Sequence, residues 1–163
     1  EGDLEHGRAG LWAQRRDEQP LFSTLKLGQP LELVIGMTGK ESLTADTVAR
    51  VRASWQQYPE RYETIFDQIG HLTMSASDAV KSGQLNELGE LMNLCHGYLN
   101  ALQLSTPELE EMIHVARQNG AVGAKLTGGG GGGSMIALCP DSTAPVKAAI
   151  EAAGYRTLAI TLD

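Results

Sequence analysis

The chain has 163 residues, of which 42% are hydrophobic and 20% are charged, and its formal net charge is −7. This length and composition are typical of one globular domain with a buried core. The negative charge argues against non-specific binding to nucleic acid or to an acidic membrane surface, and no apolar run approaches the ~18 residues that span a bilayer.

The N-terminal quarter of the chain predicts strands. Residues 10–15 and 22–27 favour two strands with a turn between them at residues 17–20, where Asp, Glu, Gln and Pro follow one another. Residues 31–37 predict a third strand. The proline before Leu31 fits this prediction, because proline is tolerated at the beginning of a strand.

The middle of the chain predicts four helices. Thr38 and Gly39 predict a turn, after which apolar residues recur at helical spacing. Proline in a first turn and glycine or asparagine after a last turn mark the boundaries. The expected helices begin near residues 44, 59, 86 and 106, and the last three end near residues 83, 102 and 119.

The C-terminal third predicts strands and one helix, at residues 122–127 (strand), 135–138 (strand), 144–153 (helix) and 155–162 (strand). This order of elements predicts an α+β fold, with an antiparallel sheet and helices packed on one face. We expect a single domain over residues 1–163, in which residues 1–30 are a strand and hairpin lead-in and residues 31–163 form the core.

Six consecutive glycines join the two strands at residues 122–138. Each glycine loses more backbone entropy on ordering than any other residue, so the run needs a reason. The backbone requires positive φ at several sites, or another group approaches closer than a Cβ allows. Such a turn can direct successive N–H groups at an anion, whereas a wide hairpin packed for structural reasons explains the glycines equally well. The run consists of Gly128, Gly129, Gly130, Gly131, Gly132 and Gly133.

The segment around the glycines, Gly-Ala-Lys-Leu-Thr, six glycines and Ser-Met-Ile-Ala-Leu, resembles the third conserved motif of mevalonate kinases. These enzymes belong to the superfamily of galactokinase, homoserine kinase, mevalonate kinase and phosphomevalonate kinase. Residues 31–39 resemble the strand and Thr-Gly turn that open the C-terminal half of such kinases, and residues 92–109 resemble the helix pair before the glycine loop. The family usually has alanine where this chain has Gly129, and often cysteine where it has Ser134.

The resemblance, which covers about residues 9–163, implies the ferredoxin-like C-terminal half of a superfamily kinase. It implies ATP-dependent phosphorylation of mevalonate with Mg²⁺, in which this chain contributes a glycine-rich loop to the cleft. The N-terminal half, with its nucleotide loop, is then an expected partner, and this chain alone is expected to be inactive. The loop residues so implied are the six glycines with Lys125, Thr127 and Ser134, and the residues implied to line the cleft are Thr38 and Gly39.

Asp3 is the candidate for the family's catalytic aspartate. It stands before a Gly-Leu-Trp segment, but the Pro-Ser pair of the family is absent and the spacing is shorter. An ordinary solvated acid at the N-terminus is the alternative.

The histidines and cysteines predict no metal site. His71, His96 and His114 are not spaced i, i+4 with one another or with the cysteines. We expect His96 to be a half-buried helix residue that hydrogen-bonds to the neighbouring turn. Cys95 and Cys139 are expected to be buried thiols, which favours a cytoplasmic protein. The acidic run at residues 108–111 is expected to be a solvated first helical turn.

Two alternatives to mevalonate kinase remain open. One is a sister kinase that acts on phosphomevalonate, homoserine or a sugar. The other is a non-catalytic, stand-alone domain that binds a small ligand or a partner, since fold does not fix function. In either kinase reading, apolar surface that a partner half would cover predicts self-association, with no nucleic acid or membrane as partner.

Overall fold

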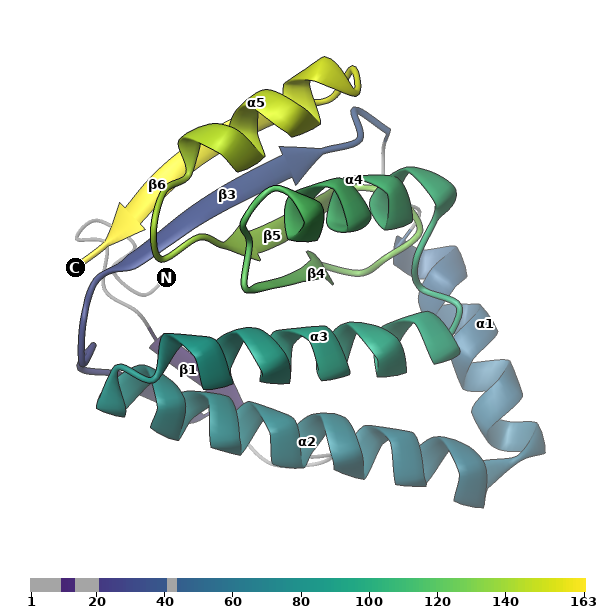
Figure 1. Cartoon of the computed structure of the whole chain (residues 1–163). Coiled ribbons are helices and arrows are strands. Elements are labelled where there is room, and N and C mark those ends of the chain that lie inside the picture. The colour runs from purple at the N-terminus through teal and green to yellow at the C-terminus, as the bar shows by residue number, and fades with distance from the viewer. Residues whose placement is uncertain (1–9, 14–20, 41–43) are drawn as a thin grey trace.

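A four-stranded antiparallel sheet forms the centre of the molecule (Figure 1). The computed structural model describes residues 10–13, 21–40 and 44–163. The strand order is β4-β5-β3-β6, and every neighbouring pair is antiparallel. With a helical crossover after β3 and another after β5, this is the βαββαβ arrangement of ferredoxin-like folds. The predicted α+β class with an antiparallel sheet is therefore confirmed. The strands are β3 (Leu31–Met37), β4 (Gly123–Thr127), β5 (Ser134–Leu138) and β6 (Arg156–Leu162).

Five helices begin and end close to the predicted positions. Proline lies in the first turn of the second, fourth and fifth helices, where its missing N–H costs nothing. Gly83 ends the second helix with a left-handed φ of 70°, and the Thr106 side chain caps the fourth by accepting from the Leu109 amide. The helices are α1 (Thr44–Gln57), α2 (Pro59–Ser82), α3 (Leu85–Ala101), α4 (Pro107–Gln118) and α5 (Ala144–Ala152).

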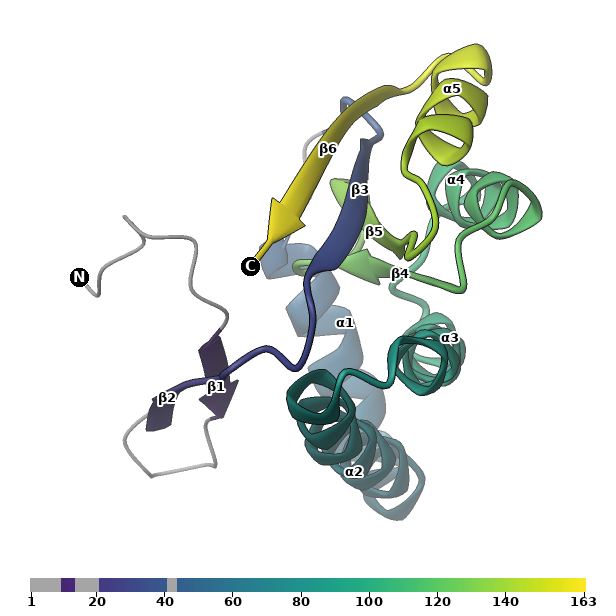
Figure 2. The same ribbon diagram turned by 60° about the vertical axis from the view of Figure 1, so that its left-hand side comes forward.

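The two faces of the sheet pack against different helices. Val34 lies in one core cluster with Met112 of α4 and Ile150 of α5, so these two helices cover one face as expected. The α2–α3 pair, however, packs beside β4 and against the opposite face, where Leu33 shares a second cluster with Leu88 of α3 (Figure 2). Burial on both faces explains why β3 is an almost continuous apolar run.

Helix α3 lies directly against the outer edge of β4. The two backbones meet at Gly89 of α3, where a Cβ would stand 2.7 Å from the carbonyl carbon and oxygen of Val122. Asn93 closes the edge beside it, since its side chain accepts from the Ala124 amide (3.0 Å) and donates to the Val122 carbonyl (3.2 Å). Side chains thus satisfy backbone groups that an open sheet edge would leave unpaired.

A separate two-stranded hairpin precedes the core. Strands β1 (Gly10–Ala13) and β2 (Leu21–Thr24) pair with each other and do not join the four-stranded sheet (Figure 2). Strand β2 begins one residue before and ends three residues before the predicted bounds, whereas the predicted end of the first strand, at residues 14 and 15, lies outside the described residues. The division into a lead-in and a core stays a prediction.

Candidate ligand site at the glycine loop

The glycine loop connects β4 to β5 as a hairpin, with Thr127 opposite Ser134 at its base. Five of its six residues take positive φ, a region that L-residues with a Cβ avoid. The expectation that this backbone needs glycine for its conformation is therefore confirmed. The φ values are 81° at Gly128, 74° at Gly130, 71° at Gly131, 134° at Gly132 and 81° at Gly133.

Close neighbours give the loop a second reason to be glycine. A Cβ on Gly130 would lie 2.6 Å from the Leu104 carbonyl oxygen, in the connection between α3 and α4. A Cβ on Gly131 would lie 2.7 Å from Oγ1 of Thr47, which is buried in the first turn of α1. The loop is thus packed between the N-terminal end of α1 and the start of α4.

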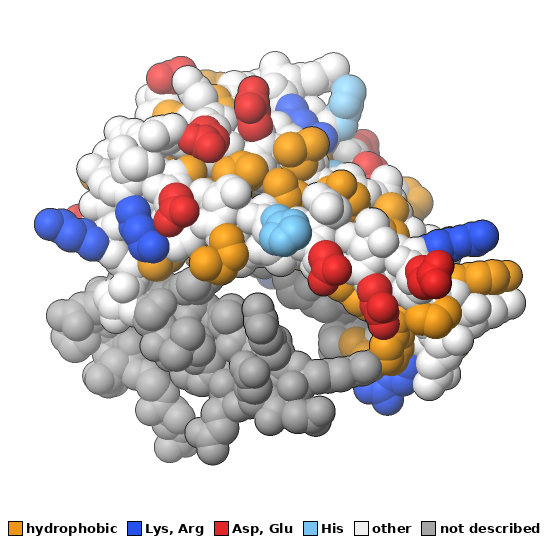
Figure 3. Space-filling model, turned by 90° about the horizontal axis from the view of Figure 1, so that it is seen from below, with side chains coloured by type: hydrophobic (Ala, Val, Ile, Leu, Met, Phe, Trp, Pro, Cys, Tyr) orange, Lys and Arg blue, Asp and Glu red, His pale blue; other side chains and the backbone are white. Residues whose placement is uncertain are grey.

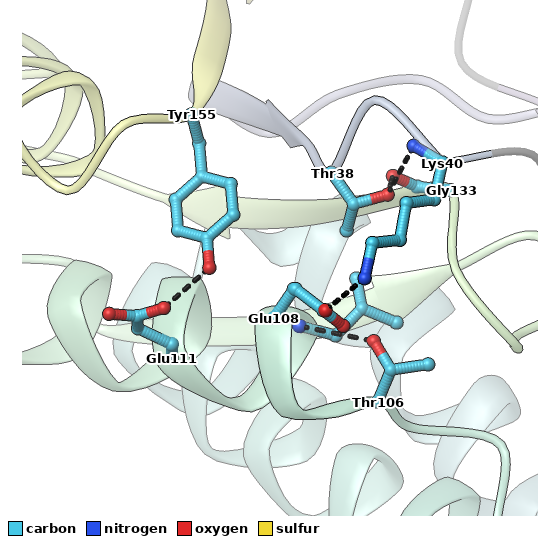
Figure 4. A network of polar contacts seen from close by, with 8 residues as sticks. Thr38, Lys40, Thr106, Glu108, Glu111, Gly133 and Tyr155 are labelled. Atoms are coloured by element: carbon cyan, nitrogen blue, oxygen red, sulfur yellow. Dashed lines mark hydrogen bonds and ion pairs between the residues drawn. The ribbon is translucent and has the colours of Figure 1, made fainter.

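Backbone and threonine hydrogen bonds fix the far end of the loop. The amide and the hydroxyl of Thr38 both donate to the Gly133 carbonyl, at 2.9 and 3.0 Å. The Gly133 amide donates to the Lys40 carbonyl (3.3 Å), and the Gly131 amide donates to the Leu104 carbonyl (2.8 Å). Thr38, one of the two residues predicted to line the cleft, therefore lies beside the glycine loop (Figure 4), and Gly39 stands between Thr38 and Lys40 in the sequence.

Some N–H groups of the glycine loop have no hydrogen-bond acceptor among the described residues. Within the part of the chain that the structure describes, the amides of Gly128, Gly129 and Gly132 donate to no backbone or side-chain acceptor. Thr44 at the beginning of α1 adjoins them, since a Cβ on Gly129 would lie 2.8 Å from its Cγ2. Free amides beside a helix N-terminus favour an anionic ligand such as a phosphate group.

The sequence suggested a solvated acidic turn at the beginning of α4. In the structure the carboxylates of this turn also pair with side chains of other elements. Glu108 forms an ion pair with Lys40, and Glu111 accepts from the Tyr155 hydroxyl (Figure 4). The hydrogen bond from Lys40 is the largest cause that lowers the pKa of Glu108 to about 2. The hydrogen bond to Glu111 raises the pKa of Tyr155 to about 12. The turn thereby ties the glycine loop to its surroundings through Lys40.

The structure does not bring Lys125 together with the other predicted loop residues. Its ammonium group donates to the Leu126 carbonyl (2.8 Å), and its side chain lines a cavity of about 130 Å³ between α2, α3 and β4. Burial lowers the pKa of Lys125, and the thiol of Cys95 faces the same cavity. Thr127 and Ser134 flank the loop at the strand ends, whereas Asp3 lies outside the described residues.

Sequence reasoning missed four residues that shape the site. Thr44 and Thr47 were predicted only as part of a helix start, and Lys40 was given no role. A Thr-x-x-Thr spacing just after a Thr-Gly turn is the signal that places two hydroxyl-bearing residues on the first turn of a helix. Leu104 carries no such signal, because its role lies in a backbone carbonyl.

The described residues include neither a helix suited to span a membrane nor a cluster of side chains suited to hold a metal ion. No helix within residues 44–163 has the length and apolarity to cross a membrane. No group of three or more His, Cys, Asp or Glu side chains in the described ranges is arranged to hold a metal ion.

Known proteins match both the sequence and the fold. Residues 76–156 match the family model for the C-terminal domain of GHMP kinases. A mevalonate kinase of Pyrococcus horikoshii is 44% identical over 129 residues, which are 76% of this chain and 38% of that enzyme. The chain thus matches less than half the length of this relative.

Solved structures place the same fold in kinases. The crystal structure of L. major mevalonate kinase in complex with R-mevalonate superposes with a TM-score of 0.90 at 30% identity, covering 97% of this chain and 50% of that one. Lactococcus lactis galactokinase complexed with galactose superposes with a TM-score of 0.63 at 23% identity, covering 88% of this chain and 47% of that one, and this likeness concerns the fold alone.

Proposed function

The chain belongs to the GHMP kinase family as a C-terminal domain, and on that premise we propose that it is the C-terminal part of an ATP-dependent mevalonate kinase. The proposed reaction transfers the γ-phosphoryl group of ATP to the primary hydroxyl of mevalonate. The observation that carries the proposal is the glycine loop, whose unpaired amides lie beside threonine hydroxyls at the beginning of α1.

This geometry suits a reaction that depends on positioning and on charge stabilisation. Phosphoryl transfer requires the protein to hold a highly charged group in line with its acceptor. The net charge of −7 offers no general attraction for ATP, so local amide and helix dipoles have to supply it. In this proposal the loop contributes donors and shape, and Thr38 and Thr44 contribute hydroxyl groups at its rim.

The residues beside the loop fit a phosphate better than a metal ion. The carboxylate of Glu108, in the first turn of α4, already forms an ion pair with Lys40. Mg²⁺ binds through one or two carboxylates and substrate phosphates. We therefore propose that ATP carries the Mg²⁺, and that protein ligands for the ion come from the N-terminal half.

Mevalonate is the proposed substrate because the relatives are named for it. Each of the eight curated relatives compared is a mevalonate kinase, at 37–45% identity. A sister kinase for phosphomevalonate, homoserine or a sugar is the alternative, since GHMP kinases share this fold. The free thiols of Cys95 and Cys139 agree with the proposed cytoplasmic location.

Complementation tests the proposed function. Residues 1–163 alone should transfer no phosphate from ATP to mevalonate, because the nucleotide loop is expected on the other half. Addition of the N-terminal half of a mevalonate kinase should produce ATP-dependent phosphorylation of mevalonate, measured as ADP release and as phosphomevalonate. Turnover by the purified chain alone would refute the two-half arrangement.

Parallel assays separate the alternatives. Phosphomevalonate, homoserine and galactose serve as competing acceptors, and preference for one of them would replace mevalonate. If the two halves associate and yet phosphorylate none of these acceptors, a non-catalytic binding domain becomes the better interpretation.

We also propose that the isolated chain self-associates. Large hydrophobic side chains are exposed on the helices, among them Val48, Phe66, Met74 and Leu94, and Leu158 is exposed on β6. Figure 3, which views the molecule from below, shows hydrophobic side chains at the surface between acidic, basic and histidine side chains. Light scattering should show dimers or larger species at high micromolar concentration, whereas a clean monomer would contradict this expectation.

A further inference from the structure

His96 holds the end of β4 next to the glycine loop. It is 4% exposed on α3, three residues after Asn93, and therefore faces the same strand edge. The Leu126 amide, two residues before Gly128, donates to Nδ1 of His96 at 3.4 Å. His96 is thus buried more deeply than the half-buried residue expected, and this hydrogen bond to a strand adds to the predicted one to a neighbouring turn.

The second ring nitrogen of His96 reaches a different element. Nε2 lies 2.9 Å from Oε1 of Glu110, in the first turn of α4. Because the Leu126 amide is a donor, Nδ1 has to be the acceptor, and the proton of a neutral imidazole then sits on Nε2 and is donated to Glu110. Both ring nitrogens are satisfied only in this neutral tautomer.

The same turn of α4 also holds the other end of the loop. Glu108 pairs with Lys40, whose carbonyl accepts from the Gly133 amide. One helical turn therefore anchors the entry to the loop through Glu110 and His96, and the exit through Glu108 and Lys40. In the first anchor His96 is buried and Glu110 is 45% exposed, whereas in the second Lys40 is 64% exposed and Glu108 is 27% exposed, so solvent reaches one partner of each anchor.

We propose that His96 is a positioning residue for the glycine loop, whose neutral imidazole ties the end of β4 to the first turn of α4 and so holds the loop amides in place. The inference rests on the proposed function in one respect, namely that these amides face a phosphate group. The tie itself is a property of the chain and is measurable without any catalytic activity.

Protonation of His96 should release the tie. A charged imidazole carries a hydrogen on both nitrogens, so Nδ1 would present a donor to the donor of Leu126. Glu110 on α4 favours the charged ring, whereas Arg117 on α4 and Lys125 on β4 oppose it, and the thiol of Cys95 is the adjacent group on α3. Burial is the largest of these influences and lowers the pKa of His96 below its ordinary value of 6.5.

The lowered pKa of His96 determines how its contribution to stability changes with pH. In the unfolded chain the histidine binds its proton near pH 6.5, and in the folded chain it binds it only at lower pH. The unfolded state therefore binds more protons in the interval between these two pKa values. The stabilising contribution of His96 is complete above pH 6.5 and is lost as the pH falls toward the lower, folded-state value.

Amide hydrogen exchange on residues 1–163, followed by NMR between pH 5 and pH 7.5, tests the proposal. The probes are the amides of Leu126, Gly131 and Gly133, each corrected for its intrinsic exchange rate. Their protection should fall about tenfold across the acidic half of this range, the size expected when one hydrogen bond is lost. His96→Gln should keep the protection and abolish its pH dependence, because glutamine supplies an acceptor and a donor and does not titrate.

Two further variants make the outcome decisive. His96→Leu should lower the protection of these amides at every pH. His114→Gln, on the exposed side of α4, should behave like the unmodified chain. The proposal is overturned if His96→Gln retains the pH dependence, or if His96→Leu keeps full protection. If His96→Leu does not fold, the His96→Gln comparison still decides. A failure of the complementation assay leaves these measurements unaffected.

Discussion

Gly131→Val is expected to lower the free energy of unfolding of residues 1–163 by about 2–3 kcal/mol, at the upper end of the range for strained backbone sites. Gly131 has a φ of 71°, where a β-branched side chain is strongly disfavoured. Its Cβ would also stand 2.7 Å from Oγ1 of the buried Thr47. Urea unfolding followed by circular dichroism measures the loss.

Gly128→Val is the matched control for this prediction. Gly128 has a similar φ of 81°, but apart from its chain neighbours no described residue has an atom within 4 Å of the position of its Cβ. Only the backbone cost should remain, about 1–2 kcal/mol for a left-handed L-residue. Equal losses in the two variants would show that contact with Thr47 adds nothing, and an unchanged stability of Gly131→Val would contradict the packed loop described above.

Gly89→Ala is expected to destabilise the chain by about 3 kcal/mol, because it overpacks the contact between α3 and β4. In most helices this substitution is stabilising, by about 1 kcal/mol, since glycine is a poor helix former. At Gly89 the new Cβ would meet backbone atoms of Val122 at 2.7 Å, and these cannot move away without shifting the strand. The sign of the change therefore tests the close approach, and thermal or urea unfolding measures it.

Gly97→Ala, on the same helix, provides the control. Gly97 is exposed, and a Cβ there meets no atom within 4 Å from other elements in the described part of the chain. This substitution should stabilise the chain by up to about 1 kcal/mol. If Gly89→Ala also raises the midpoint, α3 does not lie against β4 as described.

The helices and strands of the core were predictable because each carries a local signal. Pro59 and Pro107 mark helix starts, Gly83 marks a helix end, and the apolar residues of α2 and α4 recur with a helical period. The α+β class followed from the order of these elements. The two cores were not predictable, because an almost continuous apolar strand such as β3 does not reveal which helices cover each face.

The candidate site was only partly predictable. The glycine run and the Thr38–Gly39 turn were identified, since both are conspicuous in sequence and both lie at the site. Lys125 was grouped with the loop because it is adjacent in sequence, yet alternation along β4 directs it toward α2 and α3. The partners of Glu108 and Glu110 are 68 and 14 residues away, so the long-range ion pair in particular gives no local signal.

Whether the glycine loop shapes a phosphoryl-transfer cleft is tested most directly by kcat/KM of the complemented enzyme carrying Gly131→Val. The assay is run without denaturant, under conditions in which circular dichroism shows the variant to be fully folded. We predict that kcat/KM for ATP falls tens-fold or more, which corresponds to about 2 kcal/mol or above in the barrier. A folded Gly131→Val enzyme whose kcat/KM stays within about threefold of the unmodified enzyme, less than about 0.7 kcal/mol, would contradict this role and leave the six glycines as a packing turn.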